Sequence, residues 1–338
     1  MKKLLNTLYI HRQETYLHKE RETIVVKQAG EKLAQFPALT IANIVCFGQV
    51  SVSPFLMAYC AERGMGVSFY SEFGKYLARV EGRQTGNVLL RRQQYRWADD
   101  VNAALRIARV IIAAKVRNTR SVLLREQRNH GEVPTLKATI NHLETSLRNV
   151  KSSVSIEQLL GIEGDAANRY FSCFPQLIRN KEFKFEQRVR RPPTDAVNAL
   201  LSFVYSLMSN ECASALQGVG LDPYVGFLHQ DRPGRLSLAL DILEEFRPVW
   251  ADRFVLTLIN RRQVKPKDFI QESSGAVRLK DDARKALLSA WQERKKVEVQ
   301  HPYLEEKVAT GLLPHCQALL IARHLRGDLE YYPPYVMK

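Results

Sequence analysis

Residues 82–116, GRQTGNVLLRRQQYRWADDVNAALRIARVIIAAKV, decide the fold, because the hydrophobic periodicity of the chain changes within them. Two glycines, Gly82 and Gly86, come first, and apolar residues then recur at helical spacing from Leu89 to Val116. Helical patterning dominates from there to the C-terminus. The pattern predicts a domain boundary near residues 80–86, with a helical domain after it.

Residues 1–82 predict a small N-terminal β-sandwich. Short runs rich in β-branched and aromatic residues lie at residues 4–10, 15–17, 23–26, 39–46, 67–70 and 76–80, separated by polar or glycine-containing turns. One helix interrupts them, with Ser53 as its N-cap, Pro54 as its first residue and Gly64 at its end. A β unit of this size buries little core alone, so we expect it to form a homodimer.

Residues 86–338 predict a larger all-α catalytic domain. A helix from about residue 156 carries Glu163, and residues 194–205 are apolar on nearly every side, as expected of a central buried helix. Amphipathic helices are expected near residues 280–296 and 306–325. The predicted fold class is therefore α+β with two domains, a β-sandwich followed by an all-α domain.

The charge of the chain predicts a polyanionic partner. Fifty Lys and Arg against 35 Asp and Glu give a formal net charge of +15. DNA or RNA is the first candidate, and an anionic membrane is the weaker one, since no terminal anchor or lipidation signal accompanies the charge. The five cysteines are scattered without a CxxC pair, which predicts reduced thiols. With no signal peptide and no membrane span, we expect a soluble, cytoplasmic protein.

Three carboxylates stand in apolar sequence inside this basic chain. Glu163 shares a helical stripe with Tyr170, so helical geometry assigns it to the core, where the alternative is a buried acid paired with arginine. Asp241 and Glu244 are three apart on a helix expected to end before Pro248, which places their Cβ atoms about 5–6 Å apart on one face. The alternative for this pair is a solvated acidic face.

His229 follows the apolar run Gly226-Phe227-Leu228. A lone histidine at such a place is more often structural. Two carboxylates on different helices and one imidazole could, however, form a mixed nitrogen and oxygen site that suits Mg²⁺ or Mn²⁺ and leaves positions open for phosphate oxygens.

Basic clusters supply a surface for a phosphate backbone. They comprise Arg91, Arg92 and Arg96; Lys181, Lys184, Arg188, Arg190 and Arg191; and Arg232 and Arg235. Each could be a solvated face, but beside a metal site we expect them to hold DNA. The chain has no P-loop, no GxSxG elbow and no HExxH motif, which argues against a nucleotide-driven motor, a serine hydrolase and a zincin.

Several of these segments together resemble the CRISPR-associated spacer-acquisition integrase/endonuclease, the Cas-one family. The order and spacing agree over about 90 residues, in the segments Leu160–Gly164, Arg190–Asp195, Asn198–Ser202, Gly226–His229, Arg232–Arg235 and Ser237–Pro248. The closing segment Leu325–Leu329, with Tyr332–Pro334, is most similar to type I systems of subtype C.

The resemblance implies a metal-dependent DNA integrase/endonuclease. It implies Glu163, His229, Asp241 and Glu244 as catalytic residues, with Mg²⁺ or Mn²⁺ bound by Glu163, His229 and Glu244, and with Asp241 in a supporting role whose loss is milder. It implies DNA contacts from Arg190, Arg191, Asn198, Arg232 and Arg235.

The implied reaction inserts a captured double-stranded DNA fragment into a CRISPR array, through attack of its 3′-hydroxyl on a phosphodiester at the repeat target. The implied partners are a second copy of the chain and a dimer of the small protein Cas-two. Two alternatives stay open: a transposon-borne integrase or structure-specific nuclease outside CRISPR, and a non-catalytic basic DNA-binding protein whose acids form salt bridges.

Overall fold

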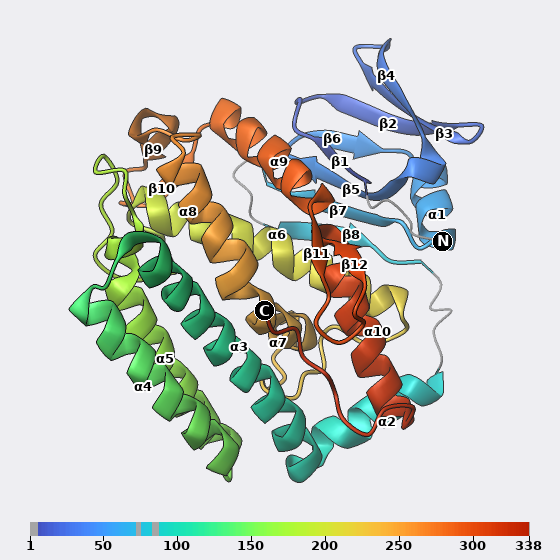
Figure 1. Cartoon of the computed structure of the whole chain (residues 1–338). Coiled ribbons are helices and arrows are strands. Elements are labelled where there is room, and N and C mark those ends of the chain that lie inside the picture. Colours follow the sequence, from blue (N-terminus) through green and yellow to red (C-terminus); the bar gives the residue numbers. More distant parts are fainter. Residues whose placement is uncertain (1–5, 72–75, 83–87, 338) are drawn as a thin grey trace. The chain divides into compact units, whose positions relative to one another are not determined.

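A computed structural model describes residues 6–71, 76–82 and 88–337 (Figure 1). By internal contacts the chain forms two compact units. The first comprises Met1–Thr85, Arg284–Val297 and Thr310–Leu312, and the second comprises Gly86–Ala283, Glu298–Ala309 and Leu313–Lys338. The units are therefore not continuous in sequence, because a late segment packs with the N-terminal strands. The expected assignment of dimerisation to residues 1–82 and of catalysis to residues 86–338 stays a prediction.

The first unit contains two four-stranded sheets. One has the order β1-β5-β7-β8, from Asn6–Ile10, Ile41–Phe47, Gly66–Tyr70 and Tyr76–Val80. The other has the order β4-β3-β2-β6, from Glu31–Pro37, Thr23–Gln28, Thr15–Glu20 and Val50–Val52. Their shared core includes Leu17 and Ile24 from one sheet, Ile44 and Val67 from the other, and Leu56 from helix α1.

The predicted strand-rich N-terminal region is confirmed, and its details differ from the pattern in two ways. Strands β4 and β6 were not expected, since Glu31–Pro37 is mostly exposed and Val50–Val52 is only three residues long. Helix α1, Pro54–Glu62, begins as predicted, with the Ser53 hydroxyl accepting from the amide of Leu56 at 3.1 Å. Parallel pairs β1-β5, β5-β7 and β2-β6 need crossover connections, so the sheets are not a meander.

The second unit is built on helices. They are α2 (Val88–Asp99), α3 (Val101–His130), α4 (Pro134–Ser152), α5 (Ile156–Leu177), α6 (Ala196–Gly218), α7 (Ser237–Phe246), α8 (Arg253–Asn260) and α10 (Leu313–Arg326). Helix α9, Asp281–Lys296, belongs mostly to the first unit. The long helix α3 packs against α4, α5 and α7, and Figure 1 shows α3, α4 and α5 side by side. Helix α3 is thus the scaffold of this unit.

The all-α prediction holds for the framework and fails for short segments. Two-stranded sheets form from β9 (Phe269–Gln271) with β10 (Val277–Leu279), and from β11 (Glu298–Gln300) with β12 (Lys307–Ala309). The helix expected over 306–325 consequently begins only at Leu313. Helix α6 is buried as predicted, with Asp195 as its N-cap. All five cysteines are free thiols, also as predicted.

The helix that carries Asp241 and Glu244 ends before Pro248, as predicted, but the helical path continues beyond it. Helix α7 ends at Phe246, and Arg247–Asp252 continues as a π-helical turn that leads into α8. Proline lacks the N–H that a regular helical bond needs, and the wider π turn accommodates that loss. The segment after Glu244 therefore stays packed against α3 and α6.

Candidate active site

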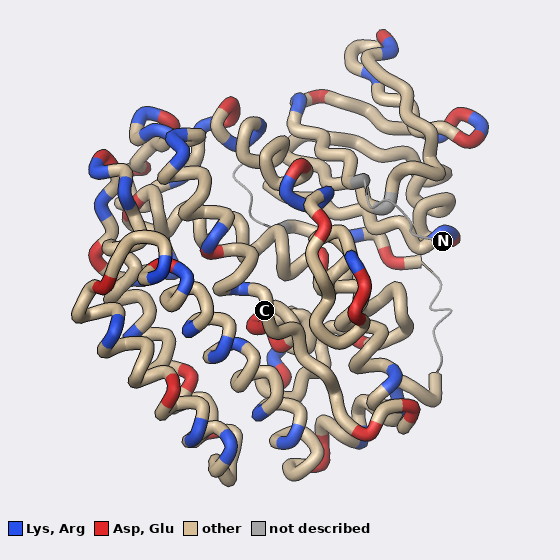
Figure 2. The backbone as a smooth tube through the Cα atoms, viewed as in Figure 1, with Lys and Arg blue, Asp and Glu red and all other residues tan. Residues whose placement is uncertain are grey.

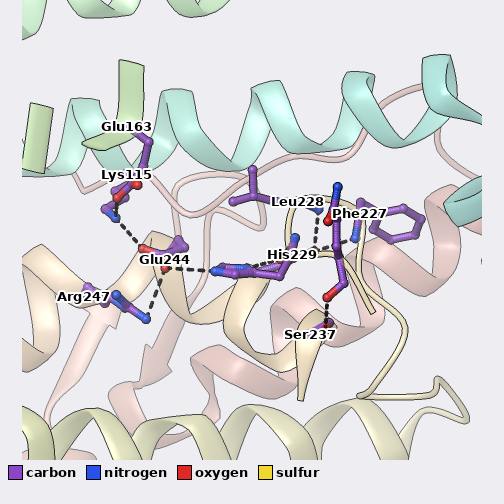
Figure 3. Close-up of polar contacts among 10 residues, drawn as sticks. Lys115, Glu163, Phe227, Leu228, His229, Ser237, Glu244 and Arg247 are labelled. Atoms are coloured by element: carbon purple, nitrogen blue, oxygen red, sulfur yellow. Dashed lines mark hydrogen bonds and ion pairs between the residues drawn. The ribbon is translucent and has the colours of Figure 1, made fainter. Parts of the chain in front are cut away.

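An ammonium group lies between two carboxylates where α5 and α7 face α3 (Figure 3). Lys115 of α3 forms ion pairs with Glu163 Oε1 of α5 and with Glu244 Oε2 of α7, the latter at 2.6 Å. The side chains of Lys115 and Glu244 are 11% and 4% exposed, so these charges are largely removed from water. Two of the predicted site residues are thus brought together by a third residue that the sequence reading missed.

A second cation holds the other oxygen of Glu244. The Nη2 atom of Arg247 lies 3.2 Å from Glu244 Oε1. Burial by itself raises the pKa of Glu244, but the charges of Arg247 and Lys115 outweigh burial and lower it to about 2. Glu244 Oε2 lies 2.6 Å from the ammonium of Lys115. Both oxygens of this buried carboxylate are therefore already paired with a cation.

Asp241 holds the segment that carries His229. Its Oδ2 accepts from the amides of Phe227 and Leu228 at 2.7 and 3.0 Å, and its Oδ1 accepts from the amide of His229 at 3.1 Å. Asp241 is fully buried. Gly226 permits this close approach, because a Cβ there would lie 2.9 Å from Asp241 Oδ2. The carboxylate of Asp241 thus fixes the backbone of residues 227–229 by accepting a hydrogen bond from each of their amides.

The same carboxylate fixes the tautomer of His229. Its Oδ1 lies 2.6 Å from Nδ1 of the imidazole. An ionised carboxylate only accepts hydrogen bonds, so Nδ1 donates and Nε2 keeps its lone pair. Nε2 lies 4.0 Å from Glu244 Oε1, so the free nitrogen faces Glu244. This is the arrangement by which a carboxylate orients a metal-binding histidine.

The side chains predicted as metal ligands do not converge on one point. Over residues 6–71, 76–82 and 88–337, no group of three His, Cys, Asp or Glu side chains lies close enough to hold a metal ion. The physical reason is Lys115, whose ammonium occupies the space between Glu163 and Glu244 (Figure 3). The sequence carried a signal for it, because Lys115 follows the apolar run Ile111–Ala114 of a buried helix face, where a charge needs a partner.

A pocket lined by basic and aromatic side chains opens beside Glu163. Its lining includes Lys115, Arg188, Arg190, Tyr205 and Arg247. The guanidinium groups of Arg188 and Arg247 lie 5.5 and 4.9 Å from the centre of the Tyr205 ring, and the Nε atom of each is buried without a hydrogen-bond partner. The pocket therefore presents positive charge and unused donors, which suits an anion.

A buried acid, Asp252, also lines this pocket. Asp252 accepts a hydrogen bond from the Tyr205 hydroxyl at 2.6 Å. Burial raises the pKa of Asp252 to about 6, although the Tyr205 hydroxyl and the charge of Arg247 oppose the rise. No sequence pattern separated Asp252 from an ordinary surface acid.

The predicted DNA-binding residues divide into two groups. Arg190, Arg191 and Arg232 are exposed, and Arg235 is half-buried, so their side chains can reach a DNA backbone. Figure 2 shows that Lys and Arg also recur along α3 and α4. The DNA contact predicted for Asn198 is wrong, because this side chain is not exposed.

Asn198 is fully buried in α6, with its amide already engaged. Its Oδ1 accepts from Nη1 of Arg188 at 2.7 Å and from the amide of Val189 at 3.0 Å, and its Nδ2 donates to Gln187 O at 2.8 Å and to Asp195. Asn198 therefore positions Arg188 at the pocket and cannot touch DNA itself.

Glu245, the residue after Glu244 in α7, is held by the C-terminal segment. It is fully buried and accepts from the Tyr332 hydroxyl at 2.7 Å, from Gln317 Nε2 at 2.9 Å and from the amide of Tyr335 at 2.7 Å. Burial raises its pKa to about 8 against these hydrogen bonds. The C-terminal segment is thus tied to the residue next to Glu244.

Comparison with known proteins shows which family the chain belongs to. A family model described as "CRISPR associated protein Cas1" matches residues 8–293. The "CRISPR-associated endonuclease Cas1 1" of Chlorobaculum tepidum is 48% identical over 343 residues, covering 100% of both chains. The chain belongs to the Cas1 family. The predicted family is confirmed, and the predicted class of enzyme with it, whereas subtype C stays a prediction.

Solved structures share the fold of this Cas1 chain. A "Casposase bound to integration product" superposes with a TM-score of 0.85 at 24% identity, covering 97% of this chain and 92% of that one. A "Cas6-RT-Cas1--Cas2 complex" superposes with a TM-score of 0.81 at 22% identity, covering 99% of this chain and 36% of that one. Among the described residues no helix is long and apolar enough to cross a membrane.

Proposed function

We propose that the chain is a metal-dependent DNA integrase/endonuclease that inserts captured DNA fragments into a CRISPR array during spacer acquisition, in antiviral defence. One observation carries the proposal. Lys115 joins Glu163 and Glu244, the free Nε2 of His229 lies 4.0 Å from Glu244 Oε1, and Asp241 holds the histidine in the tautomer that leaves Nε2 free. A non-catalytic protein with structural salt bridges has no need for that orientation.

The donor set fits Mg²⁺ or Mn²⁺. Two carboxylates and a neutral imidazole are ligands that these ions accept, and the hydrogen bond from His229 Nδ1 to Asp241 leaves Nε2 free to bind one. Glu163, Glu244 and His229 would hold the ion, and Asp241 would support it through His229. When bound, such an ion lowers the pKa of an attacking hydroxyl or water and neutralises charge on the transferring phosphate.

The other residues of the site would hold the DNA. Arg188 and Arg247 present unused Nε donors in the pocket beside Glu163, and Arg190 lines the same pocket. The exposed Arg191 and Arg232 would contact backbone phosphates farther from the reacting group. The chain thereby separates DNA binding, which basic side chains provide, from the carboxylates that serve the reaction.

The assembly is part of the proposal. The fold shared with the Cas1 of a complex named for Cas2 supports a Cas2 dimer as partner, and the small strand-rich unit supports a Cas1 homodimer. The substrate would be double-stranded DNA with 3′-hydroxyl ends together with a repeat-bearing target. The shared fold of a casposase bound to an integration product favours strand transfer over cleavage alone.

Strand transfer into a repeat-bearing plasmid tests the proposal, with Mg²⁺ and again with Mn²⁺. Glu163→Ala, His229→Ala and Glu244→Ala should each abolish transfer and cleavage and leave DNA affinity nearly unchanged. Glu157→Ala is the matched control, because Glu157 is an exposed acid on the same helix as Glu163. Full activity in Glu163→Ala contradicts the site. Transfer that ignores the repeats favours an integrase outside CRISPR, and DNA binding without any reaction favours the non-catalytic alternative.

A further inference from the structure

Lys115 occupies the position that a metal ion would share. Its ammonium pairs with both Glu163 and Glu244, and Arg247 pairs with Glu244. We propose that Lys115 is a resident counter-cation, which a divalent metal ion displaces, and that a DNA phosphate receives the displaced ammonium. Metal and DNA would then bind cooperatively. The inference rests on the proposed function and adds the order in which the site is loaded.

The charge balance of the site carries the first step. In the free protein the carboxylates of Glu163 and Glu244 face the ammonium of Lys115 and the guanidinium of Arg247, so the formal charges of these four side chains cancel. A divalent ion added to this group leaves it with an excess of positive charge. Because the side chains of Lys115 and Glu244 are only 11% and 4% exposed, water screens that excess weakly. A metal ion alone is therefore opposed by the protein's own cations.

The neighbouring pocket carries the second step. The same Lys115 side chain lines the pocket that Arg188, Arg190 and Arg247 also line. An ammonium released from Glu163 and Glu244 therefore lies beside a pocket that can hold an anion. The Nε donors of Arg188 and Arg247 have no hydrogen-bond partner there, which points to an anion as the ligand of this pocket. A backbone phosphate there restores the charge balance that the metal ion disturbs. DNA should then raise metal affinity, and the metal should raise DNA affinity by the same factor.

Replacing Lys115 separates its charge from the rest of the site. Lys115→Met keeps most of the side-chain length and removes the competitor, so Mn²⁺ should bind about tenfold more tightly without DNA. The gain in Mn²⁺ affinity on adding DNA should shrink in this variant, because the metal ion then displaces no ammonium that a DNA phosphate would have to neutralise. Arg117→Met is the matched control, since Arg117 is an exposed cation on the same helix and its loss should leave both quantities unchanged.

The experiment measures bound Mn²⁺ from the electron paramagnetic resonance signal of the free ion. Wild type and both variants are titrated with and without a short DNA duplex, at one salt concentration. Tighter binding and weaker coupling in Lys115→Met, with neither in Arg117→Met, supports the inference. Equal Mn²⁺ affinity in wild type and Lys115→Met overturns it.

Two further outcomes are also decisive. Wild-type protein that binds no Mn²⁺ with or without DNA contradicts the proposed function itself, which distinguishes that failure from failure of the inference. If Lys115→Met does not fold, the wild type decides alone, through DNA affinity measured with and without Mn²⁺. Unchanged DNA affinity on adding Mn²⁺ overturns the cooperative loading, and a matching increase supports it.

Discussion

Replacing Asp241 by asparagine tests how strongly one carboxylate organises this site. The carboxylate accepts from four N–H groups: the amides of Phe227, Leu228 and His229, and Nδ1 of the imidazole. Each of its oxygens accepts two of them. Asparagine keeps one oxygen, so two donors lose their acceptor whichever way the amide is oriented, and they then face an NH₂ group.

The size of the effect follows from the burial of Asp241. A buried donor without a partner costs about 1–3 kcal/mol, so Asp241→Asn should lower the free energy of unfolding by about 2–6 kcal/mol if both donors stay unpaired. If the amide nitrogen faces Nδ1, the imidazole proton moves to Nε2 and Nδ1 accepts from the NH₂ group, so only the amide of His229 stays unpaired and the cost is about 1–3 kcal/mol. That orientation removes the free nitrogen that faces Glu244. Strand transfer should therefore fall sharply in protein that is still folded. This revises the mild effect expected for Asp241 from sequence.

The assay pairs urea unfolding, followed by circular dichroism, with strand transfer at a temperature where the variant is folded. Asp231→Asn is the control, because Asp231 is an exposed acid in the loop after His229, and it should change neither quantity. Asp241→Asn with wild-type stability and a wild-type transfer rate would refute the positioning role given to this carboxylate.

Three further predictions concern stability and binding. The pKa of Asp252 is raised from its ordinary 3.8 to about 6, so its contribution to stability is full below about 3.8 and lost as pH rises through about 6. Asp252→Asn lacks this titration, and the stability of wild type relative to the variant should fall by about 2 kcal/mol between pH 4 and 6, as urea unfolding at each pH would show. Asn118→Ala should lower the free energy of unfolding by about 2–5 kcal/mol, because this buried amide donates to the carbonyls of Glu245 and Tyr335 and accepts from the amide of Met337. A loss below about 1 kcal/mol in thermal or urea unfolding would count against this role. DNA affinity should fall steeply as salt rises, given the net charge of +15, and an affinity equal at low and physiological salt would remove the electrostatic explanation of binding.

Local patterns in the sequence predicted the elements that depend on neighbouring residues. Residues only a few positions apart determine these elements, so the sequence shows them directly: the caps Ser53 and Asp195, the helical stripe around Glu163 and the buried helix α6. The same patterns failed at Val50–Val52, which is too short to show a period, and they gave no sign of the π turn that follows the predicted end of α7 before Pro248.

Residue types by themselves determined the candidate acids, the histidine and the basic character of this Cas1 chain, because an acid in apolar sequence and an excess of Lys and Arg need no structure to be noticed. Only the tertiary structure decided their partners. Lys115 stands 48 residues before Glu163 and meets it because α3 packs against α5. Asn198 turned out to be a buried support for Arg188. Which charge compensates a buried charge depends on distances between helices, and long-range packing sets those distances, whereas local spacing does not.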